Sequence, residues 1–142
     1  MTLKVLAASL LIFIAQGAGA QSDFITVKSE FITDSTELER LLKGNSLIGT
    51  YNDLHFIQLL KPDGQLEVAV KGEETILKAS WYINDKALYC EQWPDHISCF
   101  RIGIDPNHSG NTKEGQRLLV EGTDEAKIVS FLHQGLIPLI FD

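Results

Sequence analysis

After Gly44, apolar and polar residues alternate with a period of two, and they do so in short runs. The runs cover residues 46–51, 55–60, 65–70, 75–83, 87–93, 97–104, 117–121 and 127–133. A period of two places successive side chains on opposite faces of a strand, so each run predicts a strand with one apolar face. The links between the runs are too short for the helical crossovers that parallel strands require. The pattern therefore predicts an antiparallel meander.

The number of predicted strands indicates how the sheet is arranged. A sheet of about eight strands in a short chain tends to curl or close, because closure removes the unpaired edges. The chain has 142 residues, of which 44% are hydrophobic, and this is enough for one core. We therefore expect a mainly β fold, a small antiparallel meander closing into a barrel or half-barrel, with one short N-terminal α-helix.

The helix is expected directly before the first strand. Asp34 can cap the amides that follow it, and Leu38, Leu41 and Leu42 form one apolar stripe that ends before Gly44. A helix of about nine residues is marginal in isolation, so its leucines are expected to dock on an end or a face of the sheet.

Two cysteines, Cys90 and Cys99, flank a turn in which Pro94 and Asp95 suit the two central positions. A hairpin that turns there places the cysteines opposite each other, within reach of a disulfide bond. The same register puts Arg101 on the cysteine face, where its charge can stay in water. The opposite face is then the predicted interior, and it carries Tyr89, Trp93, Phe100, Ile102 and Ile104.

The first 20 residues have the features of a secretory signal peptide. Lys4 precedes an apolar run at residues 5–14, and small residues lead to a cleavage site after Ala20. The run is shorter than the roughly 20 residues of a membrane span, so we expect no transmembrane segment in the mature chain. The protein is expected to be secreted or periplasmic, with a signal peptide at 1–20, a leader or edge strand at 21–33 and a single β-rich domain at 34–142.

Several of these features occur together in one known group of proteins. Residues 37–51 read Glu-Leu-Glu-Arg-Leu-Leu-Lys-Gly-Asn-Ser-Leu-Ile-Gly-Thr-Tyr, and Lys61-Pro62-Asp63-Gly64, Trp81, Cys90 and Cys99 follow. Over residues 35–102 this order resembles small secreted alphaproteobacterial proteins of unknown function (DUF995-like). Those proteins place a glycine before the tryptophan strand, whereas this chain has Ala79-Ser80-Trp81. The resemblance implies a bacterial secreted β-rich domain and no particular activity.

Charge and motifs argue against several classes of function. The formal net charge is -7 and the basic residues form no run, which disfavours nucleic-acid binding. His55, His96, His108 and His133 lack the spacing of a metal site. The sequence contains no nucleophile elbow and no phosphate-binding loop. We therefore expect no cofactor and assign no catalytic residue.

One loop partly matches a calcium-binding loop. Asp105, Asn107 and Ser109 place oxygen-bearing side chains at alternate positions before Gly110. Gln116 stands where such a loop needs a bidentate glutamate. An ordinary polar connection between strands has the same composition, so the three residues are candidate metal ligands only.

Three functional hypotheses follow. The first is a non-enzymatic binding module that engages a partner protein through its surface or through an apolar C-terminal segment, comprising Leu136, Ile137, Leu139, Ile140 and Phe141. The second is a lipocalin-like carrier that holds a small apolar ligand against Trp81, Tyr89 and Phe100, because eight-stranded barrels are either filled by side chains or hold one ligand. The third, a metal-dependent or hydrolytic enzyme, has no motif behind it.

Overall fold

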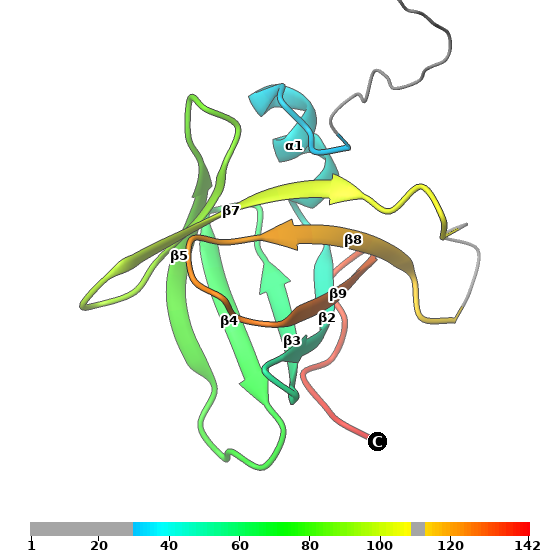
Figure 1. Ribbon diagram of the computed structural model, residues 1–142. Helices are drawn as coiled ribbons and strands as arrows, with labels where there is room; N and C mark the ends of the chain where they lie inside the picture. The colour runs from blue at the N-terminus through cyan, green and yellow to red at the C-terminus, as the bar shows by residue number, and fades with distance from the viewer. Residues whose placement is uncertain (1–29, 109–112) are drawn as a thin grey trace, which may run out of the picture. The chain divides into compact units, whose positions relative to one another are not determined.

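The computed structural model describes residues 30–108 and 113–142, in which eight antiparallel strands form one closed barrel (Figure 1). Each strand pairs with the next along the chain, and the last pairs back with the first. The predicted mainly β meander is therefore confirmed, and it closes into a full barrel. The strands are β2 (Ser46–Tyr51), β3 (Leu54–Leu60), β4 (Gln65–Val70), β5 (Leu77–Ile83), β6 (Tyr89–Gln92), β7 (Ile97–Ile104), β8 (Gln116–Glu121) and β9 (Ile128–His133).

The pairing of β2 with β9 closes the barrel, and it depends on a glycine. Gly49 pairs with Ser130 at the middle of this ladder. A Cβ atom added to Gly49 would overlap the carbonyl oxygen of Val129. The two backbones therefore approach more closely than any residue with a side chain would allow.

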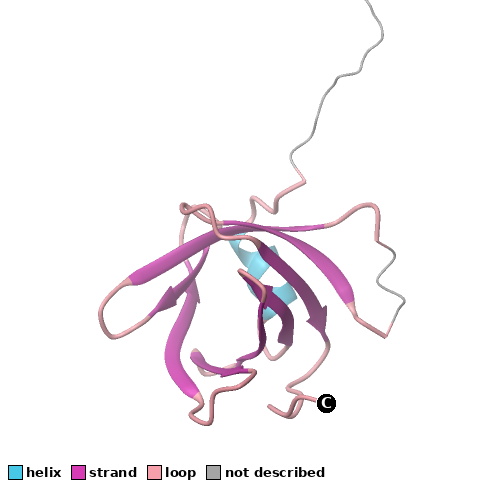
Figure 2. Cartoon of the chain, turned by 60° about the horizontal axis from the view of Figure 1, so that its bottom comes forward, coloured by secondary structure: helices cyan, strands magenta, loops and turns pink. Residues whose placement is uncertain are grey.

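Helix α1 (Ser35–Leu42) lies at one end of the barrel, as Figure 2 shows by placing it behind the ring of strands. Asp34 caps it, because the Asp34 carboxylate accepts hydrogen bonds from the amides of the first turn. Leu38 and Leu42 are fully buried and belong to the core. The hydroxyl of Ser35 donates to the carbonyl oxygen of Asn84 (2.9 Å), in the β5–β6 turn. The predicted helix and its docking are confirmed.

The β6–β7 hairpin has the predicted turn and register. The amide of Trp93 donates to the carbonyl oxygen of His96 (2.9 Å), so Pro94 and Asp95 occupy the turn. Cys90 pairs directly with Cys99 and forms a disulfide with it, with the two Cα atoms 4.0 Å apart. The disulfide is therefore confirmed.

The described part of the N-terminal region begins at Glu30, so the predicted signal peptide at 1–20 and most of the leader at 21–33 lie outside the described residues. Phe31 forms an isolated antiparallel bridge with Gly103 of β7, and the amide of Ile32 donates to the carbonyl oxygen of Ile102 (2.8 Å). Across residues 30–108 and 113–142, no helix has the length and apolar character to span a membrane.

The contact at Gly49 leads to a stability prediction. Gly49→Ala should lower the free energy of unfolding by about 3 kcal/mol, because the new methyl group must push β2 away from β9. Urea denaturation followed by circular dichroism measures the change. Thr50→Ala, at the next position of the same strand, is the control and should cost less than about 1 kcal/mol. Equal losses in the two variants would contradict the proposed role of Gly49.

Candidate functional site

The barrel encloses a cavity of about 340 Å³ to which all eight strands contribute side chains. Its lining is mainly apolar and aromatic, with a small number of polar groups. The polar side chains in the lining, apart from the tyrosines and Trp93, are Gln58, Glu91, His96, Ser98 and Ser130. A mainly apolar wall with a few polar groups is the usual composition of a small-molecule site.

The cavity lies toward the end of the barrel opposite α1. Consecutive strands of a meander run in opposite directions, so the β2–β3, β4–β5, β6–β7 and β8–β9 connections share one end. Large apolar side chains at this end line the cavity and are partly exposed: Tyr51 by 39%, Leu54 by 59% and Leu77 by 43%. Helix α1 fills the other end with Leu38 and Leu42. The barrel is therefore a cup with a closed base and an apolar mouth.

A hydrogen-bond network surrounds the Glu91 carboxylate on the cavity wall. Oε2 of Glu91 accepts from the hydroxyl of Tyr89 (2.7 Å) and from Nε2 of Gln58 (2.5 Å). Oε1 accepts from the indole N–H of Trp93 (3.1 Å). Gln58 also donates to the hydroxyl oxygen of Tyr89 (2.6 Å). These donors offset part of the cost of holding a carboxylate among apolar groups.

Tyr89 is held in its protonated form by this arrangement. Burial raises the pKa of Tyr89 well above its ordinary value of 10.0, and the neighbouring Glu91 carboxylate raises that pKa further. The Tyr89 hydroxyl therefore remains a hydrogen-bond donor to Glu91 at neutral pH.

Ser130 supplies a second polar position in the cavity wall. It lies on β9, is 2% exposed, and its Oγ has no hydrogen-bond partner among the described residues. A buried hydroxyl without a partner is uncommon in folded proteins and calls for an explanation. A polar group of a bound molecule would satisfy it.

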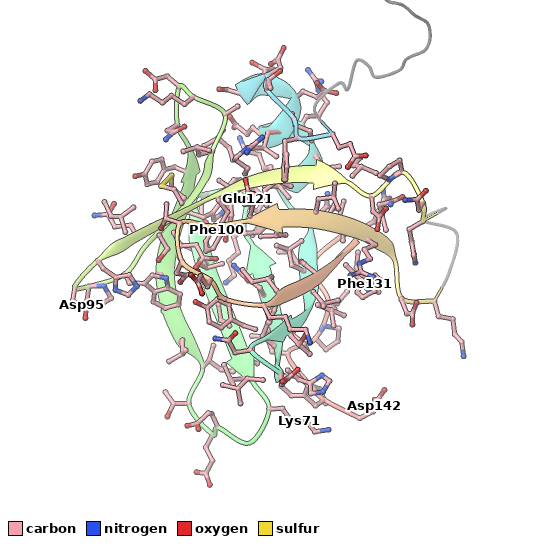
Figure 3. All side chains as sticks on the ribbon, in the orientation of Figure 1. Lys71, Asp95, Phe100, Glu121, Phe131 and Asp142 are labelled. Atoms are coloured by element: carbon pink, nitrogen blue, oxygen red, sulfur yellow. A yellow bond between two sulfur atoms is a disulfide. The ribbon has the colours of Figure 1, made fainter. Side chains whose placement is uncertain are left out.

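Of the three residues predicted to contact a ligand, two line the cavity. Tyr89 and Phe100 face it, with their ring centroids 6.1 Å apart. Figure 3 labels Phe100 on β7 and Asp95 at the tip of the same hairpin. Trp81 instead belongs to the buried core, where its indole N–H donates to the carbonyl oxygen of Lys61 (2.9 Å).

The polar residues of the cavity were not predicted from the sequence, although their positions along the strands were informative. Glu91 stands between Tyr89 and Trp93 at a spacing of two, so it lies on the same face as these aromatic residues. Gln58 stands in the same way between Phe56 and Leu60. A polar residue among alternate strand positions that otherwise carry apolar, inward-facing side chains is the signal that would have identified both positions.

The C-terminal segment follows β9 and lies against the start of β2 (Figure 1). The hydroxyl of Ser46 donates to the carbonyl oxygen of Gly135 (2.7 Å) and accepts from the amide of Ile137 (3.1 Å). Leu136 and Ile140 are exposed, by 45% and 73%. The other predicted partner-binding residues, Ile137, Leu139 and Phe141, are half-buried.

The candidate cation loop is described only in part, because Ser109 lies outside the described residues. Oδ1 of Asp105 accepts from the amide of Asn107 (2.9 Å), and Oδ2 lies 3.9 Å from the guanidinium of Arg117. In residues 30–108 and 113–142, no group of three or more His, Cys, Asp or Glu side chains is arranged to hold a metal ion.

Comparisons of the chain with protein-family models, with curated proteins and with solved structures find no match. The resemblance to DUF995-like proteins therefore stays a prediction.

The Glu91 network leads to a prediction about pH. An unfolded tyrosine ionises above about pH 10 while Tyr89 stays neutral in the folded protein, so the free energy of unfolding should fall as the pH rises above that value. In Tyr89→Phe the fall in the free energy of unfolding that Tyr89 causes at high pH should be absent. At pH 7 the variant should lose about 1–2 kcal/mol, because Glu91 loses a donor. Urea denaturation at pH 7 and at about pH 11 measures both effects.

Tyr82→Phe is the matched control, because Tyr82 is 38% exposed and lies on the outer face of β5. It should leave the stability at pH 7 unchanged. A loss at pH 7 equal to that of Tyr89→Phe would contradict the role given to the Tyr89 hydroxyl.

Proposed function

We propose that this protein binds one small, mainly apolar molecule inside the barrel, in the manner of a carrier. The observation that carries the proposal is the cavity of about 340 Å³, which is closed at one end by α1 and has an apolar mouth at the other. Ligand sites in proteins commonly measure about 300–1,000 Å³. The cavity is at the small end of that range, which favours a ligand of modest size.

The exposed apolar residues at the mouth support the same function. Tyr51, Leu54 and Leu77 leave apolar surface in contact with water, at a free-energy cost that a bound apolar molecule would reduce. The alternative of a metal-dependent enzyme has no support in the described residues, because none of their acidic, histidine or cysteine side chains form a metal-binding group.

Export from the cytosol fits a carrier of this kind. The disulfide between Cys90 and Cys99 and the absence of a membrane-spanning helix in the described residues are consistent with a secreted or periplasmic protein. The signal peptide at residues 1–20 belongs to the same proposal.

Partner binding through the C-terminal segment is the second candidate function. Ile140 is the most exposed of the large apolar residues described, and Leu136 of the same segment is also exposed. Hydrogen bonds from Gly135 to Asn45 and from Ile137 to Ser46 attach this segment to the barrel. The segment therefore presents two apolar side chains from a defined position.

The cavity proposal predicts that filling the cup abolishes binding. Ser98 lines the cavity and pairs with Glu91 on the adjacent strand, so Ser98→Trp would place an indole ring in the cavity. Titration with N-phenyl-1-naphthylamine, a neutral fluorophore that brightens in apolar surroundings, should give a defined affinity for the wild type. Ser98→Trp should weaken that affinity by at least about tenfold, because the ring occupies the space of the ligand.

Ser80→Trp makes the same change on the outer face of β5, at an exposed position, and should bind the fluorophore like the wild type. Thermal unfolding of each variant checks that it is folded. Unchanged affinity in a folded Ser98→Trp variant, or no binding by the wild type, would overturn the proposed function.

The second candidate function predicts that substitutions of the exposed apolar residues of the C-terminal segment weaken partner binding, although the segment stays attached to the barrel. The double variant Leu136→Ser with Ile140→Ser should lose a cross-linked partner that the wild type retains, because both changes remove exposed apolar surface. Ile97→Ser with Ile104→Ser, which are 54% and 41% exposed elsewhere and do not line the cavity, is the matched control. Equal recovery of cross-linked protein by all three forms would exclude the segment as a docking site.

A further inference from the structure

We propose that the ligand is an amphipathic cation: an apolar body with a protonated amine that binds the carboxylate of Glu91. This inference rests on the proposed function, because it concerns the same cavity. It adds the charge of the ligand, because the size and the apolar character of the cavity do not determine that charge.

The first observation is the charge of the cavity wall. Glu91 is the one aspartate or glutamate in the lining, and the lining contains neither lysine nor arginine. Among the described residues Glu91 forms no ion pair. The single histidine, His96, directs Nδ1 toward Asp95 (2.7 Å) at the exposed tip of the hairpin. The wall therefore presents one negative charge without a cation beside it.

The second observation is the unused capacity of the carboxylate. A carboxylate offers about four acceptor positions, and Glu91 uses three of them. Oε2 receives the hydroxyl of Tyr89 and the amide of Gln58, whereas Oε1 receives only the indole of Trp93. Oε1 can therefore accept one more hydrogen bond. An ammonium group would donate this hydrogen bond and would also bring the positive charge that the cavity wall lacks.

The third observation is the aromatic surface around Glu91. Tyr89 and Trp93 stand two residues before and after it, on the same side of the chain, and both line the cavity. Both rings turn a donor toward the carboxylate: the Tyr89 hydroxyl donates to Oε2 (2.7 Å) and the Trp93 indole N–H to Oε1 (3.1 Å). The two aromatic residues therefore hold the carboxylate in position within an apolar wall, where a charge-assisted hydrogen bond to an ammonium group is stronger than it would be in water.

Ser130 gives independent evidence that the wall is built for a molecule with polar groups. Its Oγ is buried, lines the cavity and has no partner among the described residues. Ser130 lies on β9 and Glu91 on β6, so the two polar positions belong to different parts of the wall. A hydrocarbon without polar atoms would leave the Ser130 hydroxyl without a partner and the Glu91 charge without a counter-ion.

The same wall disfavours anionic ligands such as fatty acids. A ligand carboxylate inside the cup would lie near Glu91 without any lysine or arginine in the lining to compensate. Like charges in surroundings of low dielectric constant repel strongly. Among ligands of equal length we therefore expect the affinity to decrease from the amine to the alcohol to the acid.

The test compares octylamine, octan-1-ol and octanoate at pH 7.5, each as a competitor of N-phenyl-1-naphthylamine bound to the wild-type protein. Octylamine should bind at least about tenfold more tightly than octan-1-ol, in line with a buried charge-assisted hydrogen bond, and octanoate should bind most weakly. In Glu91→Gln the affinity for octylamine should fall to that of octan-1-ol, while the affinity for the alcohol changes little.

Glu121→Gln is the matched control, because Glu121 pairs with Arg101 on the outer surface (2.7 Å) and does not line the cavity. It should retain the preference for the amine. Equal binding of the three competitors to the wild type would overturn the cation proposal and leave the carrier function standing, even if Glu91→Gln did not fold. Equal loss of preference in both variants would also overturn it. Failure of the fluorophore itself to bind would instead overturn the proposed function.

Discussion

The pairing of β2 with β9 is the contact on which the rest of the structure depends. Without it the eight strands would form an open sheet with two unpaired edges and no enclosed volume. Gly49 makes the pairing possible, because a side chain there would collide with the backbone of Val129. Closure converts a sheet with an apolar face into a container, and α1 then fills one end of it with Leu38 and Leu42.

The network around Glu91 exists only because the barrel is closed and curved. Gln58 lies on β3 and Glu91 on β6, with β4 and β5 between them. Their side chains meet across the interior, so no pairing of adjacent strands would bring them together. A carboxylate held in this way costs free energy that an all-apolar wall would avoid, and such a cost is common at binding sites. This cost is consistent with the role in ligand recognition that we propose for the network.

The outer wall shows that the barrel has more than one apolar surface. Ile57, Leu59 and Ala69 point away from the interior, yet each is less than 10% exposed. The C-terminal segment is attached beside this wall through Ser46. Within this segment Ile137, Leu139 and Phe141 are half-buried, while Leu136 and Ile140 keep exposed surface.

The sequence alone determined the local features: the strands, the capped helix, the turn at Pro94 and the pairing of Cys90 with Cys99. Each depends on a period, a cap or a spacing of a few residues. The alternation also determined the inward face of β6 and β7, but not that of β3, whose Ile57 and Leu59 are buried on the outer face. It did not determine the position of a side chain along the barrel axis. Trp81 and Leu77 share an inward face of β5, yet Trp81 packs into the core and Leu77 lies at the mouth. The tertiary structure decided three further features: the cavity, the meeting of Gln58 with Glu91, and the Ser130 hydroxyl, which has no partner among the described residues. They depend on the distances between strands that closure brings together.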